Sequence, residues 1–320
     1  MVTRIATESS AASCLDGSAP VKRAELRASV HAPFRYVAYG MKVTADIELW
    51  PNVPEPLDQS VPSDTIVSLG QWPLNRAEPG VGLLDAHFRW QDLAEVSVSN
   101  GARIDVCAVP GADHRELSAA VAGPGLAAAF GQRGLLVLHG TCVAFGDQAV
   151  CLLGESGAGK STLAAALCAS GAQLVSDTMT VVELQKSNAT VRVGPAQFKL
   201  WPDAALALGY DSKMQRALPG TDKRLCPFVG RMAAPSARLL RAFVVVPEEP
   251  VAAVPLSPAA AAAALARNLF LAGYLKPELR LSSLALCARM AEQVPVRVLH
   301  RGNSLAALPM VLRSIRASDA

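Results

Sequence analysis

The segment 154–161 constrains the fold more than any other part of the chain, because it reads GESGAGKS and satisfies the pattern G-x-x-x-x-G-K-[ST]. The apolar run 149–153 precedes it, and the helix-forming run 162–170 follows it. A strand, a glycine loop and a helix in this order are typical of a phosphate-binding loop, in which backbone N–H groups and the positive end of the helix face the phosphates. An ordinary glycine turn is the alternative, and the complete motif in this setting favours the phosphate-binding loop. The sequence therefore predicts an α/β fold with a P-loop nucleotide-binding core.

Each residue type in this loop has an expected task. The glycines let the backbone turn with positive φ, so that several N–H groups point inward. Lys160 is placed to reach the β- and γ-phosphates of a nucleoside triphosphate, and the Ser161 hydroxyl is placed to ligate the Mg²⁺ that bridges them. The loop therefore predicts a nucleoside triphosphate and Mg²⁺ as the bound groups. The predicted nucleotide-binding residues are Gly154, Glu155, Ser156, Gly157, Ala158, Gly159, Lys160, Ser161 and Thr162.

A carboxylate follows the loop at a position that suits metal or base chemistry. Asp177 lies 17 positions after Lys160 and directly follows the apolar segment 173–176. A carboxylate there emerges beside the loop, where it either holds Mg²⁺ with Ser161 or accepts the proton of an incoming hydroxyl during phosphoryl transfer. Asp also often ends a strand as a cap or turn residue. The position favours function, and both the metal-binding and the catalytic role are predicted for Asp177.

Further polar residues are candidates on weaker grounds. His139 ends the apolar run 135–138, and a lone histidine in such a run is usually a satisfied core residue. The segments 198–203 and 221–224 carry cations that can neutralise phosphate charge, with Lys223 and Arg224 as candidate phosphate or acceptor contacts. Exposed Lys and Arg are, however, most often solvated surface residues.

Composition disfavours several classes of partner. Thirty Lys and Arg against 27 Asp and Glu leave a net charge of +3, which disfavours a nucleic-acid partner. The apolar runs are cut by Pro, Gly or charge before the ~18 residues of a membrane span, so no membrane partner is expected. The seven cysteines form no C-x-x-C pair, and several lie in apolar runs, which is typical of buried thiols in a reducing cytoplasm.

The chain divides into three predicted parts. Residues 1–34 lack the apolar core of a secretory signal and are expected to be a disordered extension. Residues 35–130 are expected to form a strand-rich region, with prolines marking a surface loop within 51–62, and residues 131–320 the nucleotide-binding domain. Strands are predicted at 36–43, 65–69, 86–90, 95–98, 103–106, 135–138, 141–145, 149–153, 173–176, 180–184, 190–193 and 296–299. Helices are predicted at 116–132 with an interruption near 123–125, and at 163–168, 203–208, 258–272, 281–293 and 305–315.

Three segments in this order resemble the C-terminal catalytic domain of HPr kinase, a bacterial protein-serine kinase: 138–140 (LHG), 154–162 (GESGAGKST) and 174–177 (LVSD). The chain looks closer still to HPr kinase-related proteins of peptide-modification clusters, including lasso-peptide kinases. This closer resemblance covers nearly everything after the first 34 residues. It includes segments 36–41, 132–136, 199–204, 223–224 and 294–299.

The resemblance implies a nucleotide core related to phosphoenolpyruvate carboxykinase and transfer of phosphate from ATP, with Mg²⁺, to a serine hydroxyl. By position it makes Asp177 the base and His139 an electrostatic or orienting group. It also implies a homo-oligomer, since HPr kinase works as one. The leading hypothesis is therefore a serine kinase acting on a peptide or small protein, such as a lasso-type precursor peptide.

Two departures from the family keep alternatives open. Family members usually carry two adjacent aspartates where this chain has Asp177 and Thr178, so activity is slower, relies on another carboxylate such as Glu155 or Glu183, or is absent. The Arg- and Gly-rich loop used for the reverse, phosphorylase reaction is not found, so a bifunctional enzyme is not expected. The alternatives are a catalytically impaired nucleotide-binding partner protein and a small-molecule kinase.

Overall fold

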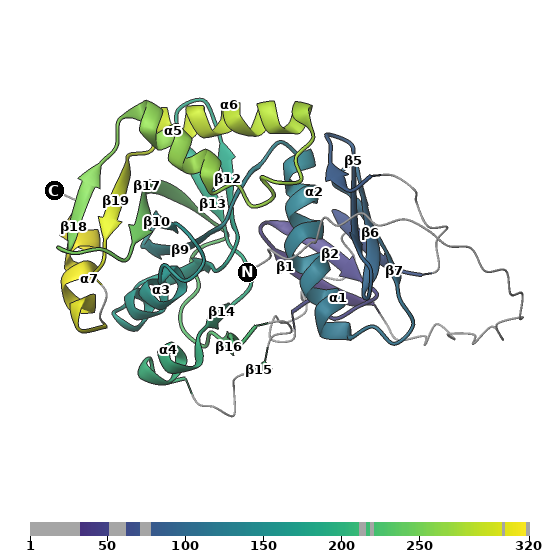
Figure 1. Ribbon diagram of the computed structural model, residues 1–320, viewed down its shortest axis with the longest axis horizontal. Coiled ribbons are helices and arrows are strands. Elements are labelled where there is room, and N and C mark those ends of the chain that lie inside the picture. Colours follow the sequence, from purple (N-terminus) through teal and green to yellow (C-terminus); the bar gives the residue numbers. More distant parts are fainter. Residues whose placement is uncertain are drawn as a thin grey trace, which may run out of the picture. The chain divides into compact units, whose positions relative to one another are not determined.

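A computed structural model describes residues 33–50, 62–70, 78–210, 216–217, 221–302 and 305–317 (Figure 1). Residues 33–320 form one compact unit of mixed α/β structure, which confirms the predicted class. Residues 1–32 of the predicted extension, 1–34, lie outside the described residues. Residues 51–61 of the predicted proline-rich loop, 51–62, also lie outside them. The boundary between 35–130 and 131–320 stays a prediction.

The first sheet contains seven strands in the order β1-β2-β3-β7-β6-β5-β4. The pairs β2–β3 and β3–β7 are parallel and the others antiparallel. Alternation of buried and less buried residues, as along β6, places one face of each strand in a core. The strands are β1 (Phe34–Ala38), β2 (Met41–Ala45), β3 (Thr65–Leu69), β4 (Gly80–Val81), β5 (Asp85–Trp90), β6 (Ala94–Ser99) and β7 (Arg103–Ala108).

The prediction of a single strand over 36–43 is wrong. The chain turns back at Tyr39 and Gly40, whose φ angles are 53° and 68°, and β1 pairs antiparallel with β2. A two-residue hairpin turn with positive φ at both positions matches the twist of the flanking strands. Tyr39 carries this conformation without being glycine or asparagine, so the turn lacks its usual sequence signal.

Helices α1 (His114–Ala120) and α2 (Leu126–Gln132) follow the first sheet and are joined by a π-helical turn, η1 (Val121–Gly125). The predicted interruption of this helix near 123–125 is confirmed. Pro124 lies inside the turn, where a missing N–H and a bulky ring disturb α-helical hydrogen bonding. Buried residues 126–130 join the same apolar core as the first sheet.

The second sheet contains nine strands around β17 (Ser236–Val246), which pairs parallel with β10 and β19 and antiparallel with β13. The others are β8 (Leu136–Leu138), β9 (Gly140–Phe145), β10 (Gln148–Leu153), β11 (Gln173–Ser176), β12 (Thr180–Leu184), β13 (Ala189–Arg192), β18 (Ala252–Pro255) and β19 (Val296–His300). The sequence analysis did not identify β17. Arg238 and Arg241 interrupt its apolar pattern, which hides the longest strand of the described chain.

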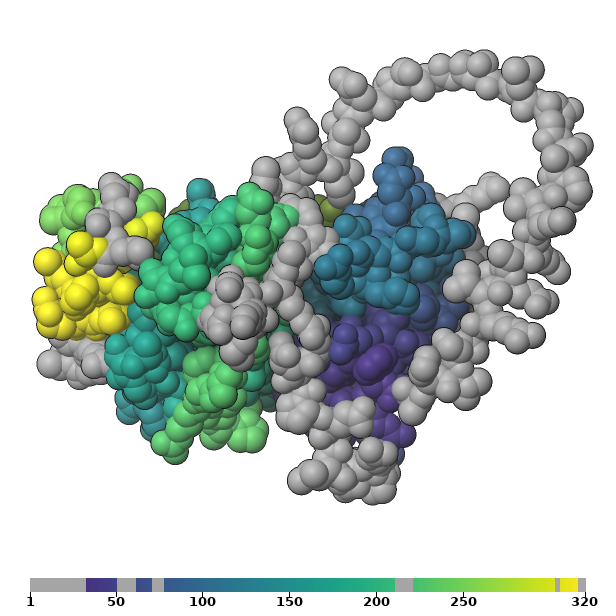
Figure 2. Space-filling model, turned by 90° about the horizontal axis from the view of Figure 1, so that it is seen from below, coloured from purple at the N-terminus to yellow at the C-terminus, as the bar shows by residue number. Residues whose placement is uncertain are grey.

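Helices cover both faces of this sheet (Figure 1). Cys151 and Leu153 of β10 pack in a core with α5 (Pro258–Arg267) and α6 (Pro277–Gln293). Val150 and Leu152, which point to the opposite face, pack in a second core with α3 (Lys160–Ala169) and α7 (Leu308–Ala317). Figure 2 shows the C-terminal residues, in yellow, gathered at one side of the displayed face, and α7 contacts α3.

The helix predicted over 258–272 ends earlier than expected, at Arg267. Asn268 follows it as the cap, and its side chain donates a 2.8 Å hydrogen bond to the carbonyl oxygen of Ala264.

A small third sheet contains the strands β14 (Gln197–Leu200), β16 (Arg224–Pro227) and β15 (Arg216–Ala217), in that order. The short helix α4 (Pro202–Ala207) follows β14 in the chain. Within the described ranges, none of the helices is long and apolar enough to cross a membrane.

Candidate active site

The glycine loop connects β10 to α3, as the sequence predicts. Gly154 and Gly159 have φ angles of 127° and 94°, which favour glycine. A Cβ atom at Gly154 would lie 2.6 Å from the carbonyl oxygen of Val245, and one at Gly159 would lie 2.8 Å from Nε of Arg301. Gly154 therefore requires glycine for space as well as for backbone conformation, whereas at Gly159 the requirement is the backbone conformation, because the neighbouring atom belongs to a long side chain.

Asn268, at the end of α5, holds the start of this loop. Its Oδ1 accepts a 2.8 Å hydrogen bond from the Gly154 N–H, and its carbonyl oxygen accepts one of 2.7 Å from the N–H of His139. With the bond to Ala264 described above, the Asn268 side chain connects α5 to the loop, and its backbone carbonyl connects α5 to the residue that follows β8. The sequence analysis missed Asn268, and no motif marks it. A polar residue within an alanine-rich helical run was its only signal.

Lys160 lies folded against the loop. Its ammonium group donates hydrogen bonds of 2.7 Å to the Gly154 carbonyl and 2.8 Å to the Glu155 carbonyl, and only 6% of the residue is exposed. Burial lowers the pKa of this lysine to about 8, although the nearby Asp177 carboxylate acts in the opposite direction. The ammonium is therefore poorly solvated, and an anion at the loop would compensate for the lost water.

Asp177 receives hydrogen bonds on both carboxylate oxygens. Thr141 and Ser161 each donate a 2.7 Å bond to Oδ1, and the backbone N–H of Lys199 donates a 2.7 Å bond to Oδ2. The Thr178 hydroxyl adds a long contact of 3.4 Å to Oδ2. The side chain follows β11 directly, and the structure thus brings the predicted Ser161 and Asp177 together.

These two residues fit a magnesium ion. The Ser161 hydroxyl and Asp177 Oδ1 are hard oxygen donors 2.7 Å apart at the start of α3. Mg²⁺ in phosphoryl-transfer sites is commonly held by one or two carboxylates and by substrate phosphates. In the part of the chain that the structure describes, no group of three or more His, Cys, Asp or Glu side chains is placed to hold a metal ion. The donor set suits an ion that is shared with a phosphate ligand.

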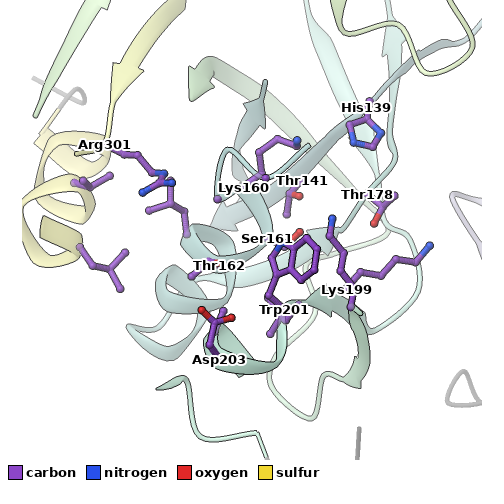
Figure 3. Close-up of a pocket in the computed structure, with 18 residues that line it drawn as sticks. His139, Thr141, Lys160, Ser161, Thr162, Thr178, Lys199, Trp201, Asp203 and Arg301 are labelled. Atoms are coloured by element: carbon purple, nitrogen blue, oxygen red, sulfur yellow. The ribbon is translucent and has the colours of Figure 1, made fainter. Parts of the chain in front are cut away.

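The loop opens into a cavity of about 480 Å³, which we call the main cavity (Figure 3). This volume is in the range of small-molecule sites. Four cationic side chains line it: Lys160, Lys199, Lys223 and Arg301. Burial lowers the pKa of Lys199, while the nearby Asp177 acts in the opposite direction. The cavity therefore favours a polyanionic ligand of nucleotide size.

The predicted loop residues divide into two groups. Gly157, Gly159, Lys160, Ser161 and Thr162 line the main cavity. Gly154, Glu155, Ser156 and Ala158 shape the loop without lining the cavity.

His139 lines the main cavity, and its ring lies 5.7 Å from that of Phe270. Burial and the Lys160 charge lower the pKa of His139 to about 4. The ring is therefore neutral at pH 7 and can exchange hydrogen bonds with a ligand, without adding positive charge.

The two predicted downstream cations differ. Lys223 lines the main cavity, with its ammonium 5.6 Å from the centre of the Trp201 ring. Arg224 does not line it and donates a hydrogen bond to the carbonyl of Asp222. The alternative carboxylates Glu155 and Glu183 do not line it either, and Glu183 pairs with Arg192 at 2.8 Å.

Arg301, just after β19, is a cavity residue that the sequence analysis missed. Its Nε donates a 2.7 Å hydrogen bond to the carbonyl of Ala158, and Nη1 donates to the carbonyl of Gly302. The guanidinium thus contacts the glycine loop near its end, at Ala158. Its signal was a basic residue at the end of a predicted strand, a common place for ligand contacts in α/β sheets.

Comparisons with known proteins add little to this geometry. No protein-family model matches the chain, and no curated protein matches it. Among solved structures, the Hpr(Ser) kinase/phosphatase from Coxiella burnetii aligns with 57% of this chain and 95% of that chain, at 12% identity and a TM-score of 0.32. A match at this level assigns neither a family nor an activity.

Proposed function

We propose that this chain is an ATP- and Mg²⁺-dependent phosphotransferase that moves the γ-phosphate to a serine hydroxyl of a peptide or small protein. The observation that carries the proposal is the 2.7 Å hydrogen bond between Ser161 Oγ and Asp177 Oδ1 beside Lys160 and the main cavity. This bond supports the proposal because it brings a hydroxyl and a carboxylate together beside the glycine loop. Phosphoryl transfer requires this combination of positioning, charge neutralisation and a proton acceptor.

The chain's residues divide these tasks. The loop N–H groups and Lys160 hold the β- and γ-phosphates, and Lys199, Lys223 and Arg301 offset their remaining charge. Ser161 and Asp177 would hold Mg²⁺, which would supply positive charge that offsets the negative charge of the phosphates. Neutral His139 donates or accepts a hydrogen bond at the edge of the cavity.

Asp177 serves as the proton acceptor. The acceptor oxygen forms a bond to the γ-phosphorus, while the bond from that phosphorus to the bridging oxygen breaks and its electron pair leaves with ADP. The hydroxyl proton passes to Asp177 Oδ2. A carboxylate has about four lone-pair positions, and Oδ1 already accepts from two hydroxyls, whereas Oδ2 accepts one short bond.

One observation favours a second candidate function, a nucleotide-binding partner protein with impaired catalysis. Thr178 stands beside Asp177 with a φ of 71°, a strained value for a β-branched residue, and it cannot take up a proton at neutral pH. The Thr178→Asp variant discriminates, because a large gain in transfer supports an impaired site. Unchanged transfer shows that Thr178 is compatible with catalysis.

The proposal is tested by incubating the protein with γ-labelled ATP and Mg²⁺ and with short serine peptides, small proteins or free serine. Label on a peptide or protein serine supports it. Label on free serine alone supports a small-molecule kinase. Tight ATP binding without transfer to any acceptor supports the partner protein.

A further inference from the structure

A second cavity has Asp177 in its lining and none of the residues of the glycine loop 154–162. Its volume is about 140 Å³, and its lining includes Tyr39, Trp50, Ala122 and Phe270. We call it the second cavity. Asp177 belongs to its lining although Oδ1 of the same carboxylate is bonded to Thr141 and Ser161 of the main cavity. Asp177 therefore stands between the two spaces.

Only two residues line both cavities, Thr178 and Lys199, within the portion of the chain that the structure describes. They flank Asp177 Oδ2: the Lys199 N–H donates to it at 2.7 Å and the Thr178 hydroxyl lies 3.4 Å away. Oδ2, whose second contact is the long one from Thr178, is thus the oxygen flanked by the two residues that the cavities share. The strained φ of Thr178 occurs at this wall, and such strain is concentrated at functional sites.

The walls of the second cavity are largely apolar, and ring contacts hold them in place. The Trp50 ring packs edge-on against Tyr36 at 5.1 Å, and the Tyr39 ring against Phe130 at 5.3 Å. Aromatic rings fixed in this way form a preorganised site. Arg115, at the same cavity, is paired with Asp113, and the remaining charged residues of the lining are Glu48, Asp177 and Lys199.

The size of the second cavity limits its occupant. Its 140 Å³ is too small for a nucleotide, because small-molecule sites typically span about 300–1,000 Å³. A cavity of roughly 150 Å³ with apolar walls holds a benzene-sized group. The space therefore suits one apolar or aromatic side chain.

We infer that the second cavity is the acceptor subsite, which takes one apolar side chain of a peptide beside the residue whose hydroxyl reaches Asp177 Oδ2. The inference rests on the proposed function. In-line transfer brings the attacking and leaving oxygens to opposite sides of the γ-phosphorus, so the acceptor approaches from outside the nucleotide cavity. The hydroxyl attacks the γ-phosphorus, its proton goes to Asp177, and ADP leaves with the electron pair of the broken bond.

The first test fills the cavity. Ala122→Phe places a ring in the second cavity, and Ala119→Phe does so from an exposed position on α1, with little risk to folding. Ala263→Phe, on the exposed side of α5, is the matched control. Both cavity variants are expected to raise the KM for a serine peptide at least tenfold without a matching change in the Kd for ATP. The control variant is expected to match the wild type.

The second test uses synthetic serine peptides that differ only in the residue next to the serine, on either side, with Leu, Phe, Gly or Asp in that position. The wild type is expected to show at least tenfold higher kcat/KM for Leu or Phe than for Gly or Asp. Ala119→Phe is expected to remove this preference.

The outcomes separate this inference from the proposed function. Transfer by the wild type with an unchanged peptide KM in both filled variants, or with equal use of all neighbouring residues, overturns the acceptor subsite alone. Absence of transfer to any acceptor, with ATP bound, overturns the proposed function and this inference with it. If Ala122→Phe fails to fold, Ala119→Phe and the peptide series decide.

Discussion

The Ser161 hydroxyl donates a 2.7 Å hydrogen bond to Asp177 Oδ1, which ties the first turn of α3 to the end of β11. Thr141 of β9 donates to the same oxygen at the same distance. The strands β9 and β11 and the helix α3 thus meet at this carboxylate, and Lys160 is the first residue of α3. Because these contacts fix the carboxylate before any ligand arrives, little reorganisation is needed for it to act on a substrate.

Asp177→Asn is expected to bind ATP but to lower kcat for peptide phosphorylation by roughly 10²–10⁴, the usual contribution of a positioned general base. The amide keeps the size of the side chain but cannot accept a proton at neutral pH. Single-turnover transfer and ATP titration measure the two effects separately. The exposed Asp92→Asn is the control and should match the wild type. Full transfer by Asp177→Asn contradicts the assigned role.

Asn268→Ala is expected to weaken both folding and ATP binding. The substitution leaves the buried Gly154 N–H without its 2.8 Å acceptor, and an unsatisfied buried group costs about 1–3 kcal/mol. The start of the loop also loses its connection to α5. Thermal unfolding and ATP titration check this, and a Tm and an ATP Kd equal to those of the wild type contradict the anchoring role.

ATP affinity is expected to fall as the pH rises above about 8, the pKa that burial gives Lys160. Phosphate binds the charged ammonium, so above this pH binding must take up a proton, and Kd rises by up to tenfold per pH unit. In the protein without ATP, the contribution of Lys160 to the free energy of unfolding changes with pH in the opposite direction. Between about pH 8 and the ordinary value of 10.5 the unfolded chain binds more protons, so the unfavourable contribution of Lys160 to stability decreases as the pH rises.

The control for this pH dependence is Lys160→Arg, because a guanidinium stays charged throughout the range. Calorimetric ATP titrations between pH 7 and 9.5 should show a flat Kd for this variant and a rising Kd for the wild type. Equal slopes in both proteins assign the titration to another group.

Thr178→Asn is expected to stabilise the protein by about 1 kcal/mol, because Asn tolerates the left-handed region that a β-branched residue avoids. Thr178 has a φ of 71° and donates only a 3.4 Å contact. Chemical denaturation of both proteins measures the difference. A free energy of unfolding equal to or below that of the wild type shows that Thr178 is not strained in a way Asn relieves.

The sequence predicts the part of the site that is local in the chain. The strand, loop and helix around Lys160 follow from a motif and its flanking periodicity, and Asp177 follows from its place after the next apolar run. Both signals are carried by neighbouring residues. The structure confirms the order of these elements and the proximity of Ser161 to Asp177.

Residues that reach the site through tertiary packing could not be predicted in the same way. Asn268 and Arg301 meet the loop from positions more than a hundred residues later, and nothing near them in sequence indicates that contact. The central strand β17 was not predicted because two arginines interrupt its apolar run. The turn at Tyr39 was not predicted because a tyrosine there takes a conformation that usually requires glycine or asparagine.

The most direct test of the account is transfer of label from γ-labelled ATP to a serine peptide by the wild type, by Lys160→Ala and by Lys186→Ala, a control at an exposed lysine. The account predicts transfer by the wild type and the control, and a loss of at least ~10² in Lys160→Ala, the typical effect of removing one preorganised charge-stabilising group. Equal transfer by all three proteins, or ATP binding with no transfer by the wild type, would contradict it.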